Sequence, residues 1–207
     1  MRQFLTLKKI VIISILYFMV NSGCSVFETM VNLSRLKFRL GDVNNFQLNG
    51  INISNKTRLE DINTIDLLKL SSVFASGKLP VSFTLIVEAK NPNDGTGGYP
   101  KTDATLKSFP WRLEIDGKET ITGNIDNPVS VPGTGEITYV PITINMDLLK
   151  FFNDLGYESL INLVFSIGGK EGTSSRLTLM ATPTVSTPLG DMKYPGELTI
   201  VDYSFTN

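Results

Sequence analysis

Apolar and polar residues alternate along several short runs of the chain, which is the period of a strand with one buried face. The clearest run covers residues 81–89, where apolar side chains fill every second position and only Ile86 interrupts the pattern. Within a second stretch, Asp116-Gly117 is typical of the two-residue turn of a β-hairpin. The pattern predicts strands at residues 36–40, 81–89, 111–115, 118–123, 137–144, 161–167, 176–181 and 198–205.

Two segments have helical spacing instead. Asn145 is a suitable N-cap for a helix over residues 146–155, and Gly156 is a suitable stop. Thr64 is expected to start a second short helix that ends near Gly77. The predicted apolar face of the first helix consists of Leu148, Leu149, Phe152 and Leu155.

Seven or eight short strands with one or two short helices predict an all-β fold, an antiparallel β-sandwich. The chain has no internal repeat, and residues 93–98 (Asn-Asp-Gly-Thr-Gly-Gly) have the composition of a flexible loop. We expect one domain over residues 33–207, which is long enough to bury a sizeable core.

The chain begins with the pattern of an export signal. Arg2, Lys8 and Lys9 precede an apolar run over residues 10–20. At 11 residues this run is much shorter than the roughly 20 residues that a membrane-spanning helix needs. A cleaved signal is therefore favoured over a retained transmembrane anchor.

The only cysteine, Cys24, follows this run directly and points to lipidation. Ser22 and Gly23 before it resemble the lipobox of bacterial lipoproteins, although Asn21 stands where that pattern usually has leucine. Cys24 would then become the acylated first residue of the mature chain, and several acyl chains on one cysteine anchor firmly. The alternative is ordinary secretion with Cys24 as an incidental thiol.

These observations divide the chain into a signal peptide (1–23), a lipidated tether (24–32) and the domain (33–207). Removal of the signal takes away three of the 19 basic residues and none of the 20 acidic ones, which leaves a formal charge of −4. An acidic chain of this kind lacks the basic surface that binds nucleic acid. Residues 25–28 lack the acidic run that resembles surface-export signals, so we expect the periplasmic face of the outer membrane.

Several short segments, in their order along the chain, resemble a known family. They are the strand that ends in Asn-Pro-Asn (79–93), the Leu-Glu-Ile-Asp-Gly-Lys-Glu hairpin (113–119), Val-Pro-Gly (131–133), Asp-Leu-Leu (147–149), Pro-Leu-Gly (188–190) and Gly-Glu-Leu (196–198). Together they resemble late embryogenesis abundant (LEA) type 2 domains, also called water stress and hypersensitive response (WHy) domains. The resemblance covers residues 33–205, and the insertion over 53–76 is similar to that of the bacterial lipoprotein version. It implies an immunoglobulin-like sandwich and a role in stress tolerance, with no established catalytic site.

Catalytic chemistry finds little support in the sequence. The chain has no histidine, which removes the commonest general base and the commonest metal ligand. With Cys24 acylated, Ser-His and Cys-His catalysis and the usual zinc sites are excluded. A hydrolase with a carboxylate pair or a Ser–Lys pair stays formally open, but the acidic residues are scattered along the chain. We expect no enzyme and no cofactor.

Candidate binding residues fall into two groups. Asn91, Asn93 and Asp94 could donate oxygens to calcium, but Asn and Asp more often stabilise turns by bonding their own backbone, so we expect no metal. The aromatic residues Trp111, Phe109 and Tyr139 are expected to be mainly core. The candidate ligand contacts are Met146 and Phe151, which lie off the apolar face of the predicted 146–155 helix, together with Phe152 and Tyr99.

The sequence thus favours a non-enzymatic, lipid-anchored binding or scaffolding protein of the bacterial cell envelope. One variant holds an apolar ligand, such as an acyl chain, between the sheets beside residues 146–155. The alternative is a sugar-binding accessory lipoprotein of a glycan-uptake system, for which Tyr99 beside Asn93 and Asp94 is the support. The expected partners are the membrane, through Cys24, and an unknown envelope protein or apolar ligand.

Overall fold

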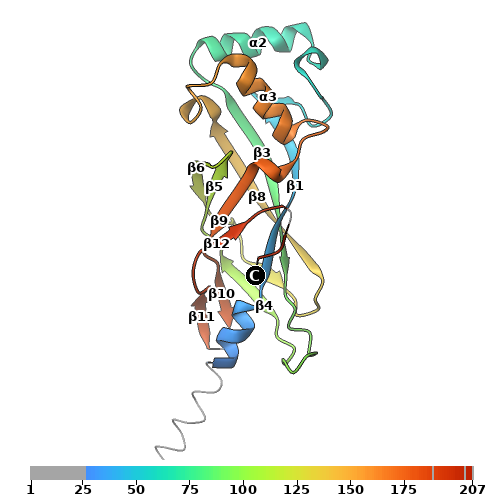
Figure 1. Cartoon of the computed structure of the whole chain (residues 1–207), viewed down its shortest axis with the longest axis vertical. Coiled ribbons are helices and arrows are strands. Elements are labelled where there is room, and N and C mark those ends of the chain that lie inside the picture. Colours follow the sequence, from blue (N-terminus) through green and yellow to red (C-terminus); the bar gives the residue numbers. More distant parts are fainter. Residues whose placement is uncertain (1–26, 188, 203, 207) are drawn as a thin grey trace, which may run out of the picture.

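The computed structural model describes residues 27–187, 189–202 and 204–206. These residues form a β-rich, sandwich-like fold of three antiparallel four-stranded sheets, which confirms the all-β prediction (Figure 1). The predicted signal peptide and Cys24 lie outside the described residues. Among the residues that are described, no helix combines the length and the apolar character needed to cross a bilayer.

The first sheet contains the longest strands and forms the spine of the molecule. Its order is β2 (Ile51–Asn52), β1 (Lys37–Leu48), β3 (Pro80–Lys90) and β8 (Ile137–Asp147). Along β3 burial alternates without exception, so one face packs inward and the other is only partly covered. The pairing of β3 with β8 is continuous from one end of β3 to the other.

The other two sheets are built from short strands. One has the order β12 (Leu198–Ile200), β9 (Leu177–Ala181), β5 (Trp111–Ile115) and β6 (Lys118–Gly123). The other has the order β11 (Gly190–Lys193), β10 (Thr184–Thr187), β4 (Ala104–Ser108) and β7 (Val129–Val131). The hairpin between β5 and β6 turns at Asp116 and Gly117, whose φ angles of 51° and 74° fit the predicted two-residue turn.

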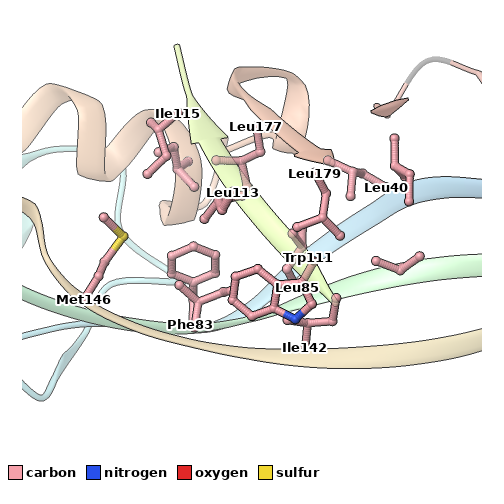
Figure 2. Close-up of a cluster of buried hydrophobic side chains, with 14 of the residues drawn as sticks. Leu40, Phe83, Leu85, Trp111, Leu113, Ile115, Ile142, Met146, Leu177 and Leu179 are labelled. Carbon is pink, nitrogen blue, oxygen red and sulfur yellow. The ribbon is translucent and has the colours of Figure 1, made fainter. Parts of the chain in front are cut away.

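The core lies between the first sheet and the β5–β9 sheet. Figure 2 shows Phe83 and Ile142 of the long strands facing Trp111, Leu113 and other apolar side chains of the short ones. Trp111 is only 6% exposed, so the indole is core, as its phase with Leu113 predicts. Phe109 is also fully buried, whereas Tyr139 on the outer face of β8 is 63% exposed.

Three helices accompany the sheets, against the one or two that the sequence predicts. Residues 27–34 are helical, and this helix covers the second half of the segment expected to be a tether (24–32) and the start of the domain. Helix α2 (Thr64–Ala75) begins at the predicted residue, and the side chain of Asn63 caps it by accepting from the amide of Asp66. Helix α3 (Tyr157–Gly168) lies beside α2 at the opposite end of the molecule from residues 27–34 (Figure 1).

The predicted helix over residues 146–155 is wrong. Strand β8 continues through Met146 to Asp147, because the alternation of buried residues persists beyond Ile144. A single 3-10 turn follows at Leu148–Lys150, and the Asp147 carboxylate accepts from the amide of Leu149 at its start. Met146 therefore points into the core instead of lying off the apolar face.

The predicted strand over residues 161–167 is also wrong, because these residues belong to α3. A nearly continuous apolar run is compatible with either a buried strand or a buried helix, and period alone cannot separate them. Gly156, expected to stop a helix, is instead the N-cap of α3. The last predicted strand is shorter than expected: β12 ends at Ile200, and the chain then runs beside β1, where Thr206 donates to the carbonyl of Phe38.

A candidate ligand pocket at the N-terminal end

A pocket of about 230 Å³ opens between the helix over residues 27–34, the segment before β4, and the β10–β11 turn. These segments lie together at the end of the molecule opposite α2 and α3 (Figure 1). Its apolar lining residues are Leu33, Leu36, Pro100, Ala104, Val185 and Leu189. Its polar lining residues are Glu28, Thr29, Asn32, Asn93, Thr102, Asp103, Ser186 and Thr187.

The helix over residues 27–34 is held in place by both packing and hydrogen bonds. Leu33 is 4% exposed and joins the main hydrophobic core. The Tyr194 hydroxyl donates to the carbonyl of Ser34 at 3.0 Å, and Asn93 Nδ2 donates to the carbonyl of Asn32 at 2.9 Å. Because helix ends leave backbone carbonyls without partners, these two side chains anchor the C-terminal turn of the helix.

The Asn-Pro-Asn turn after β3 also lies at this end of the molecule. Asn91 is fully buried, and its Nδ2 donates to the carbonyls of Thr102 and Val131 at 2.8 and 3.0 Å. Its Oδ1 accepts from the amide of Asn93 at 3.2 Å. Asn91 therefore ties three segments of backbone together, which is the structural role that asparagine plays in turns.

The other acidic and amide groups of this loop also bond locally. Asp94 Oδ1 accepts from the amide and the hydroxyl of Thr96, and these two bonds hold the pKa of Asp94 below its ordinary value of 3.8. Asp103 accepts from the amide of Gly133. Nowhere in the described ranges do three or more His, Cys, Asp or Glu side chains converge as metal ligands would.

Two polar atoms near this end are buried without a hydrogen-bond partner. Asn93 is 2% exposed, and its Oδ1 has no donor although its Nδ2 is engaged. Arg35 has an unpartnered Nη1, while its Nη2 donates to the carbonyl of Pro92 at 3.4 Å. Of the two residues, Asn93 is one that lines the pocket, and its Oδ1 is a buried acceptor without a partner.

Large apolar side chains are exposed at this same end. Phe27 and Met30 on the N-terminal helix are 71% and 45% exposed, and Leu189 at the β10–β11 turn is 49% exposed. We call these three residues the apolar rim. Leu189 also lines the pocket, whereas Phe27 and Met30 do not. Exposed apolar groups that gather in one place mark contact surfaces more often than scattered ones do.

The structure does not bring together the four candidate ligand contacts from the sequence. Met146 and Phe152 are 8% and 5% exposed and belong to the hydrophobic core, and Phe151 packs against it. Tyr99 follows the far end of β3, whereas Met146 pairs with Val81 near its start. The Arg35 guanidinium covers one face of the Tyr99 ring at 3.6 Å, which leaves at most the other face for stacking.

Two further hollows have a different character. One of about 340 Å³ has a polar lining that includes Asp42, Asn44 and the backbone after α3. Another of about 390 Å³ lies at the β1–β2 turn and touches Met146. Neither contains a buried side-chain atom that lacks a hydrogen-bond partner, as judged over the described part of the chain.

Sequence reasoning identified Asn93 as a loop residue but missed the pocket around it. Its apolar walls come from three separate segments, each of which contributes only two residues. A local pattern cannot reveal such a site, because only the fold brings the segments together.

Comparison with known proteins gives no family. No family model matches the chain, and no curated protein does. Among solved structures, a protein from Archaeoglobus fulgidus is similar at 10% identity and a TM-score of 0.32, with 77% of this chain and 96% of the other covered. An X-ray structure of a Northeast Structural Genomics Consortium target has 11% identity and a TM-score of 0.33, with 81% and 88% covered.

Proposed function

We propose that the protein is a non-enzymatic, lipid-anchored binding or scaffolding module of the bacterial cell envelope, related to the LEA type 2 (WHy) domains. The observation that carries the proposal is the position of Cys24, after the predicted export signal and three residues before Phe27, the first described residue. Three residues span at most about 11 Å, even when fully extended. An acyl anchor on Cys24 therefore holds this end of the molecule close to the bilayer surface.

The apolar rim supports this orientation. Phe27, Met30 and Leu189 are exposed at the end of the molecule to which the anchor would be attached. Apolar side chains at such a position gain free energy when they insert into the interfacial region of a membrane. The other end, with α2 and α3, then faces away from the membrane, toward the periplasm if the protein sits on the outer membrane.

The binding role rests on the pocket, and the non-enzymatic role on the composition. The chain has no histidine, and its one cysteine is the residue that lipidation would consume. A role in stress protection would follow from the family resemblance alone.

The anchoring is tested by intact-mass measurement of the protein extracted from membranes. We expect a chain that begins at Cys24 and carries the mass of several acyl groups, while the Cys24→Ser variant carries none and leaves the membrane fraction. Ser25→Ala is the matched control, since it changes the neighbouring residue and keeps the thiol. An unacylated wild-type chain, or a Cys24→Ser variant that stays fully membrane-bound, would contradict the proposal.

A further inference from the structure

We propose that the pocket under the N-terminal helix binds a small amphiphile: an aliphatic segment that carries a neutral or cationic hydrogen-bond donor, such as a hydroxyl or an amine. This inference deepens the proposed function by naming the ligand class of the binding module.

The size and lining of the pocket fit an aliphatic segment. An apolar cavity of about 150 Å³ is known to hold a benzene molecule. At about 230 Å³ the pocket has room for a somewhat larger group, against walls that include Leu33, Leu36 and Val185. All three wall residues are nearly fully buried, so they form a preformed surface that needs no rearrangement.

Asn93 defines the polar part of the ligand. Its Nδ2 donates to the carbonyl of Asn32, a bond that also fixes which amide atom is nitrogen and which is oxygen. The remaining atom, Oδ1, is an acceptor without a partner in a residue that is 2% exposed. A ligand that brings a donor satisfies it, whereas a ligand with only acceptors leaves it unpaired.

The charges around the pocket select against anions. Glu28 and Asp103 are among its lining residues, and neither lysine nor arginine is. A carboxylate or phosphate group placed there would meet two like charges among the lining residues and no opposite one among them. The head group is therefore neutral or cationic.

The site also has a route of entry. Leu189 is both a lining residue and 49% exposed, so the pocket opens beside an exposed apolar side chain. An amphiphile dissolved at a membrane surface would meet Leu189 at the edge of the pocket. An apolar entrance and one buried acceptor are the usual features of a small lipid-binding site.

The test uses the full-length protein in its own membranes and a 1-octanol analogue with a photoreactive diazirine in its chain. The labelled peptides, identified by mass spectrometry, should contain residues of the N-terminal helix, of β4 and of the β10–β11 turn. Unlabelled 1-octanol should compete about tenfold better than heptyl methyl ether, which has the same number of heavy atoms but no donor; tenfold corresponds to about 1.4 kcal/mol. Octanoate should compete least.

Two variants connect the labelling to the pocket. Ala104→Leu fills it from β4 and should reduce labelling there at least about tenfold, while Ala75→Leu at the exposed end of α2 should leave labelling unchanged. Asn93→Ala should bring the preference for the alcohol over the ether close to one. That ratio does not depend on how much of the variant folds.

The proposal is overturned if labelling is unsaturable, if it maps elsewhere, or if the ether competes as well as the alcohol. The two proposals also fail separately. An unacylated wild-type chain that keeps pocket labelling contradicts the anchor only. An acylated wild-type chain without pocket labelling contradicts the ligand site only.

Discussion

The two ends of this molecule are both apolar, but within the described residues only the N-terminal end has a pocket beside a buried acceptor that lacks a hydrogen-bond partner. We call this the open end and the α2–α3 end the closed end. At the α2–α3 end large side chains fill the space between helices and strands: Phe46 stacks on Phe83 with ring centroids 4.9 Å apart, and Phe74 meets Tyr157 edge-on. At the other end a short helix, a loop and a turn meet around a pocket that holds an unsatisfied acceptor on Asn93. Apolar content therefore does not distinguish a core from a binding site. What distinguishes them is how completely the side chains fill the space between the elements.

The contrast has a local cause at Gly168, near the end of α3. A Cβ placed on this glycine would lie 2.0 Å from ring atoms of Phe46, so helix and ring are in direct contact. No comparable filling occurs under the N-terminal helix, where the β4 residue that lines the pocket is the small Ala104.

The largest expected effect is in the shared core between the two ends. Trp111→Ala should lower the free energy of unfolding by about 3–5 kcal/mol, measured by denaturant titration, because a buried indole is lost and a cavity remains. Trp111→Phe should cost less, since it also removes the buried Nε1, which has no hydrogen-bond partner. Tyr139→Ala, at an exposed position, is the control and should change stability by less than about 0.5 kcal/mol. Equal losses for Trp111→Ala and Tyr139→Ala would show that the indole is not core.

The next largest effect concerns the Asn-Pro-Asn turn at the open end. Asn91→Ala leaves the buried carbonyls of Thr102 and Val131 without their donor, and each unpaired buried group costs about 1–3 kcal/mol. The same titration measures the loss. Added calcium should not change the stability of the wild type, because this side chain bonds backbone. A calcium-dependent rise in stability that Asn91→Ala abolishes would restore the metal interpretation.

The closed end should resist any added volume. Gly168→Ala should cost about 1–3 kcal/mol through the contact with Phe46, which outweighs the gain of about 1 kcal/mol from replacing a helical glycine. Gly156→Ser is the matched control at the other end of α3. Nothing lies within 4 Å of its added Cβ, and the hydroxyl can cap the helix, so stability should rise by a few tenths of a kcal/mol. A stabilising Gly168→Ala would mean that the closed end is loosely packed.

The smallest effect is a pH dependence in the loop at the open end. The pKa of Asp94 lies below 3.8 because Thr96 donates two hydrogen bonds to the carboxylate. A lowered carboxyl pKa adds stability above the pKa of the unfolded chain, and this contribution disappears as the pH falls through the folded pKa. An NMR titration of the Asp94 carboxyl should therefore have its midpoint below 3.8, and Thr96→Ala should raise it. A wild-type midpoint at or above 3.8 would contradict the hydrogen bonds.

The long strands could be predicted from the sequence because their alternation is complete. Every second residue of β3 is buried, and Asp116-Gly117 fixes the next hairpin. The prediction for the α3 region was wrong for a physical reason. Residues 160–167 are apolar on nearly all sides, so the period that separates a helix from a strand is missing. Gly156 does not separate the two possibilities, since glycine occurs at either end of a helix.

The sheet beside the pocket could not be predicted. Strand β10 buries only Val185, and β4 buries only Ala104 and Leu106, which is too short a pattern to stand out from a loop. The pocket depends on that sheet and on a helix that covers part of the expected tether, so it could not be predicted from the sequence either. Asn93 was visible as part of a turn, but its unpaired Oδ1 is a property of the folded chain.

The most direct test of the account is a crystal structure of the protein with 8-bromo-1-octanol, in which bromine is located by its anomalous scattering. The account predicts bromine in the pocket between the N-terminal helix and β10, with the hydroxyl within hydrogen-bonding distance of Asn93 Oδ1. Bromine bound instead beside α3, near Phe151 and Phe152, would contradict the contrast between an open and a closed end.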